Sequence, residues 1–291
     1  MHVPVLLNEV LGYLDPKPNE NFIDCTFGEG GHTEAILRKT APSGKVLGIE
    51  TDAALCEKVK NSVRGLSGRL ILVNDSYANL KRIVEERNFR PVSGILLDLG
   101  LSSWHLLLSG RGFTFQKNEP LNMLFRQEGR GADEIVNHWE ENEIEKILKE
   151  YGEEKFAGAI AGKIAEKRKK KKIETTFELV EIIKEAVPKR FHYKKHPATK
   201  TFQALRIAAN NELENIRLVL PQAMEILEKK GRLAVISFHS LEDRIVKRFF
   251  RENKNSGRVR LLSKKPIVPG PDEILKNLSS RSAKLRVVIK N

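Results

Sequence analysis

The chain has 291 residues, of which 40% are hydrophobic, enough for the packed core of one large domain or of a domain with a sizeable insertion. It carries 51 Lys and Arg against 38 Asp and Glu, and this net charge of +13 favours a polyanionic partner, first of all nucleic acid. A basic protein without such a partner would have the same composition. Two cysteines, Cys25 and Cys56, exclude a disulfide framework and a Cys-x-x-Cys metal clip.

The sequence also predicts the compartment in which the protein is found. The N-terminus lacks a basic leader, and no window approaches the length of a transmembrane span, so we expect a cytoplasmic protein in a reducing setting, with no membrane contact. The seven histidines form no mixed cluster with the two cysteines. We therefore expect no metal site.

Short apolar runs rich in β-formers alternate with helical patterns in the first third of the chain and return near the end. Strands are predicted at 22–24, 45–50, 70–74, 94–99 and 232–238, and helices at 58–64 and 80–87. Alternation of this kind indicates βαβ units and an α/β fold with a mainly parallel sheet.

The alternation of strand and helix patterns stops between about Trp104 and Arg206, where helical spacing is abundant and no strand is predicted. We predict an inserted all-helical domain at 109–206, within a core formed by 1–108 and 207–291. Thr175 to Glu178 have the capping-box form that opens a helix, and Pro188 should end it. Two earlier helix faces are predicted, one from Ile135, Trp139, Ile147 and Leu148 and the other from Phe156, Ile160 and Ile164.

A basic run follows the second of these faces. Residues 167–172 read K-R-K-K-K-K and are predicted at the end of that helix. The run is either a solvated helix tail or a patch that contacts phosphates.

The stretch F-I-D-C-T-F-G-E-G-G-H, residues 22–32, places three glycines directly after the first strand. In doubly wound sheets ligands bind at this turn. Gly28 and Gly30 match the first two glycines of the dinucleotide fingerprint G-x-G-x-x-G, but Thr33 takes the third place and Gly31 is extra. The mismatch disfavours a nicotinamide dinucleotide and favours a smaller adenosyl ligand without a pyrophosphate.

Three acids close three of the predicted strands. Glu50 stands twenty residues after Gly30, where a carboxylate accepts hydrogen bonds from ribose hydroxyls, and Asp24 and Asp98 end their own strands. Carboxylates along one sheet edge suit a cationic ligand such as S-adenosylmethionine and would repel a pyrophosphate. The alternative for each strand-end Asp is a helix cap or a turn residue.

An ordered set of longer motifs carries a specific resemblance. The chain resembles the bacterial 16S rRNA (cytosine-N4)-methyltransferase family, RsmH or MraW. The motifs are H-V-P-V-L-L from His2, D-C-T-F-G-E-G-G-H from Asp24, I-L-L-D-L-G-L-S-S from Ile95, R-G-F-T-F from Arg111, Y-G-E-E-K-F-A from Tyr151, H-P-A-T-K-T-F-Q-A-L-R-I from His196, I-S-F-H-S-L-E-D-R-I-V-K-R-F from Ile236 and R-S-A-K-L-R from Arg281.

This resemblance implies a Rossmann-like, S-adenosylmethionine-dependent methyltransferase core with a helical insert that recognises the substrate. The implied reaction methylates N4 of a cytidine in the decoding centre (P site) of 16S rRNA, within the small ribosomal subunit. The cofactor-binding positions carried over from the family are Gly30, Gly31, His32, Glu50, Tyr77, Asp98 and His105.

Several positions depart from the family pattern. Glu50 stands where the family usually has Asp, and His105 where it often has Gln. Asn122, Leu124 and Ser279 replace an acid and two bases, which puts contacts with the substrate in doubt but leaves the cofactor site untouched.

Asp98 is also the candidate catalytic residue, because a carboxylate that accepts a hydrogen bond from the target amine would localise its lone pair. The cofactor competes for the same side chain. Phe238, His239 and Ser240 form a candidate wall for the flipped base, with Ser240 also fitting a helix cap. Two alternatives remain: a methyltransferase of another RNA or of DNA, and a non-catalytic nucleic-acid-binding relative.

Overall fold

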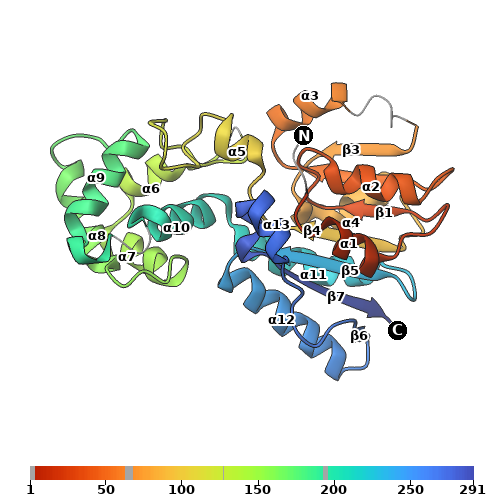
Figure 1. Ribbon diagram of the computed structural model, residues 1–291. Helices are drawn as coiled ribbons and strands as arrows, with labels where there is room; N and C mark the ends of the chain where they lie inside the picture. Colours follow the sequence, from red (N-terminus) through yellow and green to blue (C-terminus); the bar gives the residue numbers. More distant parts are fainter. Residues whose placement is uncertain (1–3, 63–67, 127, 193–195) are drawn as a thin grey trace. The chain divides into compact units, whose positions relative to one another are not determined.

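The computed structural model describes residues 4–62, 68–126, 128–192 and 196–291. The chain divides into two compact units, one made of Met1–Gly100 with Leu213–Asn291 and the other of Leu101–Glu212 (Figure 1). The second unit extends beyond the predicted insert, 109–206, at both ends.

The first unit is built on a seven-stranded sheet, and this bears out the predicted α/β fold. The strand order is β3-β2-β1-β4-β5-β7-β6, with β1 to β5 parallel and β7 antiparallel to both of its neighbours. The order reverses between β1 and β4, and ligands of doubly wound sheets bind at that switch point. The strands are β1 Phe22–Asp24, β2 Val46–Glu50, β3 Leu70–Asn74, β4 Gly94–Asp98, β5 Arg232–Ser237, β6 Val259–Leu261 and β7 Lys284–Lys290.

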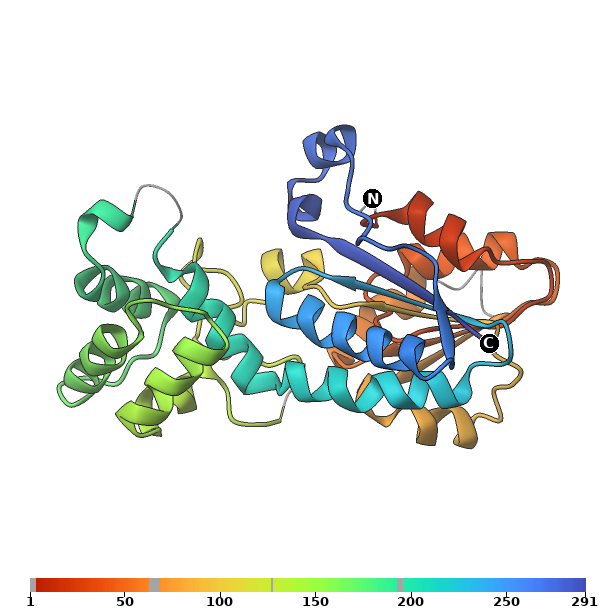
Figure 2. The same ribbon diagram turned by 90° about the horizontal axis from the view of Figure 1, so that it is seen from below.

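Helices cover both faces of this sheet (Figure 2). On one face α1 (Leu7–Leu14) and α2 (Gly31–Lys39) bury Val10, Leu14 and Ile36 in a cluster with side chains of β4, β5 and β7. On the other face lie α4 (Leu80–Glu86), α11 (Glu212–Ile226) and α12 (Ser240–Asn255). The unit also contains α3 (Ala53–Ser62) and α13 (Pro271–Lys276). Burial on both faces explains the continuous apolar runs of the central strands.

The second unit, as far as it is described, consists of helices and loops around its own core. Its helices are α5 Ser103–Leu107, α6 Ala132–His138, α7 Glu141–Glu150, α8 Ala157–Arg168, α9 Thr176–Ala186 and α10 Ala198–Asn210. Ile135, Ile144, Ile160, Ile183 and Leu205 are each fully buried in this core.

Three predictions for the helical region have clear outcomes. The capping box at Thr175 and Glu178 is confirmed, and both of its hydrogen bonds are present. The single helix face through Ile135 and Leu148 is wrong, because α6 ends at His138 and Glu140 starts α7 with its own capping box. The basic run is only partly helical, since α8 ends at Arg168.

Two predictions for the sheet unit need correction. Ser240 is not the cap of α12: His239 is, since its backbone is extended and its Nδ1 accepts from the Glu242 amide. The helix predicted at 58–64 begins earlier, at Ala53, and its predicted end lies outside the described residues. Strands β6 and β7 were not predicted.

Candidate functional site

The three predicted strand-end acids do lie at the carboxyl ends of neighbouring strands. Asp24 ends β1, Glu50 ends β2 and Asp98 ends β4, on both sides of the switch point. Asp24 and Glu50 are buried, and the Asp98 side chain is 23% exposed. This edge of the sheet is therefore a strongly acidic place in which each carboxylate needs a partner.

His32 lies between two of these acids. It stands in the first turn of α2, and its Nε2 is 3.6 Å from Oδ2 of Asp98. Burial raises the pKa of Asp24, and the nearby His32 partly offsets that rise. Neither ring nitrogen of His32 has a hydrogen-bond partner among the described residues, although both are buried. Buried polar atoms are rarely left in this state, so His32 is suited to bind a ligand.

Two threonines that the sequence reasoning missed hold the acids in place. Thr33 Oγ1 donates to Oδ2 of Asp24 at 2.8 Å, and the Thr26 amide donates to Oδ1 of the same carboxyl at 3.2 Å. Thr26 Oγ1 also accepts from the Asp98 amide at 2.6 Å, and this bond ties the end of β1 to the end of β4. The only sequence signal for these roles was their place beside the glycine turn.

Asp98 keeps one acceptor available. Its Oδ1 is buried and has no hydrogen-bond partner within the described part of the chain. An ionised carboxylate accepts at both oxygens, so this atom is positioned to receive an N–H from a ligand. Near it, the half-buried ring of Phe238 packs on Gly100, where an added Cβ would come within 2.7 Å of the ring.

The glycine turn is shaped by the protein's own side chains. Gly30 has φ +82°, and a Cβ there would lie 2.8 Å from the Phe27 ring. A Cβ on Gly31 would lie 2.4 Å from Pro4. Gly28, at φ +55°, is less crowded, because a Cβ there would come no closer than 3.8 Å to its nearest neighbour, the Thr26 carbonyl oxygen. Gly30 and Gly31 are therefore explained by close packing with Phe27 and Pro4, while Gly28 needs glycine for its left-handed backbone rather than for space.

Glu50 links the strand edge to this turn. Its Oε2 accepts from the Gly28 amide at 2.9 Å, and its Oε1 accepts from the Asp52 amide at 2.8 Å. These two bonds fix the carboxylate at the end of β2, the place where doubly wound sheets hold a ribose. The sequence predicted the place of Glu50 but not its hydrogen bond to the glycine turn.

The remaining predicted cofactor residues fall in both units. Tyr77 opens a short 3₁₀-helix after β3, and the Asp75 amide just before it donates to the Glu50 carbonyl at 3.1 Å. His105 belongs to the second unit, where its ring packs at 4.9 Å and 5.2 Å from the ring centroids of Phe125 and Phe113.

The departures from the family pattern fall at positions with local structural roles. Asn122 Oδ1 accepts from the Leu124 amide at 3.0 Å, and Leu124 itself is buried. The exposed Ser279 donates its amide to Oδ1 of Asn277 at 3.2 Å. Across the described residues, no helix has both the length and the apolar character to cross a membrane.

Comparison with known proteins gives a consistent result. The MraW methylase family model matches residues 1–291. The ribosomal RNA small subunit methyltransferase H of Persephonella marina is 46% identical over 288 residues, 98% of each chain. The protein of the same name from Clostridium botulinum (strain Kyoto / Type A2) is 42% identical, over 98% of this chain and 97% of that one. The solved structure of an rRNA methylase from Streptococcus thermophilus is 11% identical, with a TM-score of 0.47 over 100% of this chain and 99% of that one.

Proposed function

The chain belongs to the MraW methylase family, and we propose that it is an S-adenosylmethionine-dependent methyltransferase acting on N4 of a cytidine in the decoding centre of 16S rRNA. The observation that carries this proposal is the pair of buried, unsatisfied groups at the switch point, Asp98 Oδ1 and the His32 ring. Full-length relatives named as small-subunit rRNA methyltransferases support the choice of substrate.

The residues at the sheet edge fit this cofactor. S-adenosylmethionine supplies an electrophilic methyl group on a sulfonium and also carries an ammonium, a carboxylate and a ribose. Asp98 would accept from its cationic end, the glycine turn would face its carboxylate, and Glu50 would accept from its ribose. Tyr77 would pack on the adenine, and the cofactor role of His105 stays a prediction from the resemblance.

The protein's work in such a reaction is mainly alignment. An amine, a methyl carbon and a sulfur must lie on one line at close range, and a rigid site provides that geometry. Asp98 Oδ1 can instead accept from the exocyclic amine of cytosine, localise its lone pair and hold the developing positive charge. The base must leave its stack to reach this edge, and Phe238 offers an aromatic face for it.

Part of the basic run is suited to contact the RNA backbone. Lys167 and Lys171 pair with Glu185 and Glu178, at 2.8 Å and 2.5 Å. The lysine patch, Lys169, Lys170 and Lys172, is exposed and makes no ion pair with any described residue. Phe177, 45% exposed, follows a few residues later and offers a face on which a base can stack.

The proposed substrate is an assembled small subunit in the cytoplasm, because one short cytidine context carries little information. The test is transfer of labelled methyl to small subunits from cells that lack this enzyme, followed by mass spectrometry of the nucleosides. Label on cytidine N4 at the decoding centre is expected. Label on another RNA or on DNA alone would refute the substrate, and cofactor binding with no transfer to any nucleic acid would favour the non-catalytic alternative.

A further inference from the structure

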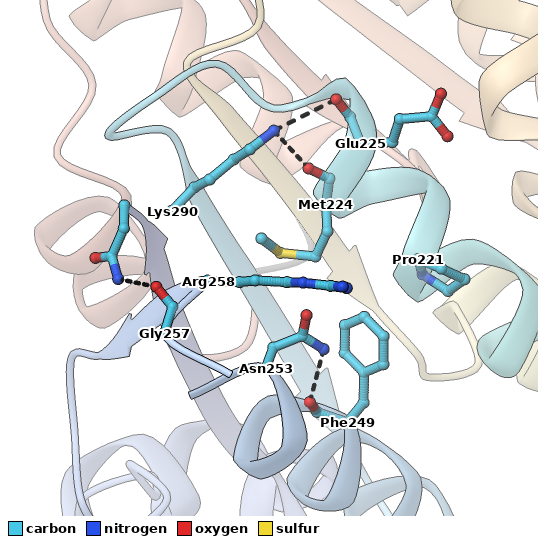
Figure 3. A pocket seen from close by; sticks show the side chains of 9 residues that line it. Pro221, Met224, Glu225, Phe249, Asn253, Gly257, Arg258 and Lys290 are labelled. Atoms are coloured by element: carbon cyan, nitrogen blue, oxygen red, sulfur yellow. Dashed lines mark hydrogen bonds between the residues drawn. The ribbon is translucent and has the colours of Figure 1, made fainter. Parts of the chain in front are cut away.

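A hollow lies in the sheet unit, between α11, α12 and the ends of β6 and β7 (Figure 3). Its volume is about 410 Å³, within the range of small-molecule sites, roughly 300–1,000 Å³. Pro221, Met224 and Phe249 supply apolar walls, while Asn253, Arg258 and Lys290 supply polar groups. The lining of the cavity therefore combines flat apolar side chains with positively charged ones.

The hollow is separate from the candidate methyl-transfer site. Arg232 begins β5 and pairs with Ile289 of β7, one residue before Lys290. The hollow therefore lies at the edge of the sheet where β5 begins, whereas Asp24 and Asp98 lie where their strands end. A ligand here would be bound independently of the cofactor.

Most charged groups at the hollow already have partners. Lys290 donates to the carbonyls of Met224 and Leu227 at 2.7 Å and 2.5 Å, so it caps the end of α11. Burial lowers the pKa of Lys290, and nearby Arg90 lowers it further. Glu225 pairs with Lys81 at 2.5 Å. The acid in the lining of the hollow is thus paired with a lysine that does not belong to the lining.

Arg258 is the exception. Its guanidinium makes no hydrogen bond or ion pair with a described residue, although its own backbone amide donates to Asn253 at 3.0 Å. Figure 3 shows the guanidinium crossing the hollow, with Met224 on one side and Asn253 and Phe249 on the other. A guanidinium presents several donors in one plane, the arrangement that binds phosphate at two oxygens.

We propose that this hollow is a second nucleotide site, in which Arg258 binds a phosphate and Phe249 stacks against the attached base. Stacking on an aromatic ring and phosphate contact from Arg are the two interactions that hold a nucleotide without reading its sequence. The ligand is either a free nucleotide or one residue of a single-stranded RNA, since both present the same chemistry.

The test titrates the full chain with cytidine 5′-monophosphate, inorganic phosphate and a six-nucleotide RNA by calorimetry. S-adenosylhomocysteine is kept at saturation so that the first site is blocked, and its own binding is measured separately, so a failure of the proposed function would be recognised on its own. The variants are Arg258→Gln and Phe249→Leu. The control is Arg38→Gln, which removes an exposed positive charge on α2, away from the hollow.

We expect saturable binding that weakens at least about tenfold in Arg258→Gln, weakens also in Phe249→Leu and is unchanged in Arg38→Gln. Binding of the monophosphate would identify a free nucleotide as sufficient, and binding of the RNA alone would identify a strand. No saturable binding of either at about 10 mM ligand would overturn the proposal. Equal losses in the two Arg variants, or inorganic phosphate binding as tightly as the nucleotide, would overturn it too.

Discussion

The packing of Phe27 against the glycine turn predicts a large and specific cost for Gly30→Ala. A residue with a Cβ in the left-handed backbone that Gly30 adopts lowers the free energy of unfolding by about 1–2 kcal/mol. The new Cβ would also lie 2.8 Å from the Phe27 ring, and that ring is already packed closely on Gly48, where a Cβ would lie 2.6 Å from it. Overpacking of this kind costs about 1–3 kcal/mol, so the expected total is about 2–5 kcal/mol.

Urea denaturation followed by circular dichroism measures this loss in the free energy of unfolding. Gly28→Ala is the matched variant, since its backbone is also left-handed but its nearest neighbour is 3.8 Å from the new Cβ, so it should cost only about 1–2 kcal/mol. Gly12→Ala, in α1 with open space around it, should stabilise by about 0.5–1 kcal/mol. Equal losses in Gly30→Ala and Gly28→Ala would refute the role given to Phe27.

Three further predictions follow from the buried acid, the cysteines and the lysine patch. Because burial raises the pKa of Asp24 in the folded state, its contribution to stability is full at acid pH and is lost as the pH rises through that raised pKa. Asp24→Asn should therefore become more stable relative to wild type as pH rises, as urea midpoints between about pH 4 and 7 would show; a constant difference would contradict this. Burial raises the pKa of Cys56 to about 12 and also raises that of Cys25 well above its ordinary value, so neither should react with a thiol reagent at neutral pH until the chain unfolds, and rapid labelling of the native protein would contradict it. Replacing the lysine patch by Gln should lower the salt dependence of RNA binding, measured as log K against log salt, by about 0.7–0.9 per lost phosphate contact. The control is the same change at three paired lysines, Lys149, Lys163 and Lys184; equal slopes for the two triple variants would remove the patch from the RNA interface.

The central strands were predictable because local signals agreed. β1, β2 and β4 are short, apolar and closed by an acid, and the structure places all three acids at one edge. β7 escaped prediction because charged residues interrupt it. Arg286 reads as a solvent-facing residue, yet its guanidinium pairs with Asp243 at 2.6 Å, and both side chains are only 14% exposed. A partner 43 residues away in sequence cannot be recognised from local pattern.

The sequence indicated which residues make up the candidate site, but not the contacts that explain why those residues stand there. The sequence indicated that the turn needs glycine, but the reason at Gly30 and Gly31 is contact with Phe27 and Pro4, which depends on tertiary packing. The cap of α12 was misplaced by one residue for a similar reason. Ser is the better cap by type, but only His239 has the extended backbone that a cap requires.

The most direct test of the account is calorimetric titration of the full chain with S-adenosylmethionine, comparing wild type with Asp98→Ala. The control is Asp272→Ala, an acid exposed on α13. The account predicts one site per chain in wild type and control, and binding about ten- to a hundredfold weaker in Asp98→Ala, because a hydrogen bond to a charged group contributes about 1.5–3 kcal/mol. Wild-type protein that does not bind, or an Asp98→Ala variant that binds as tightly as wild type, would contradict it.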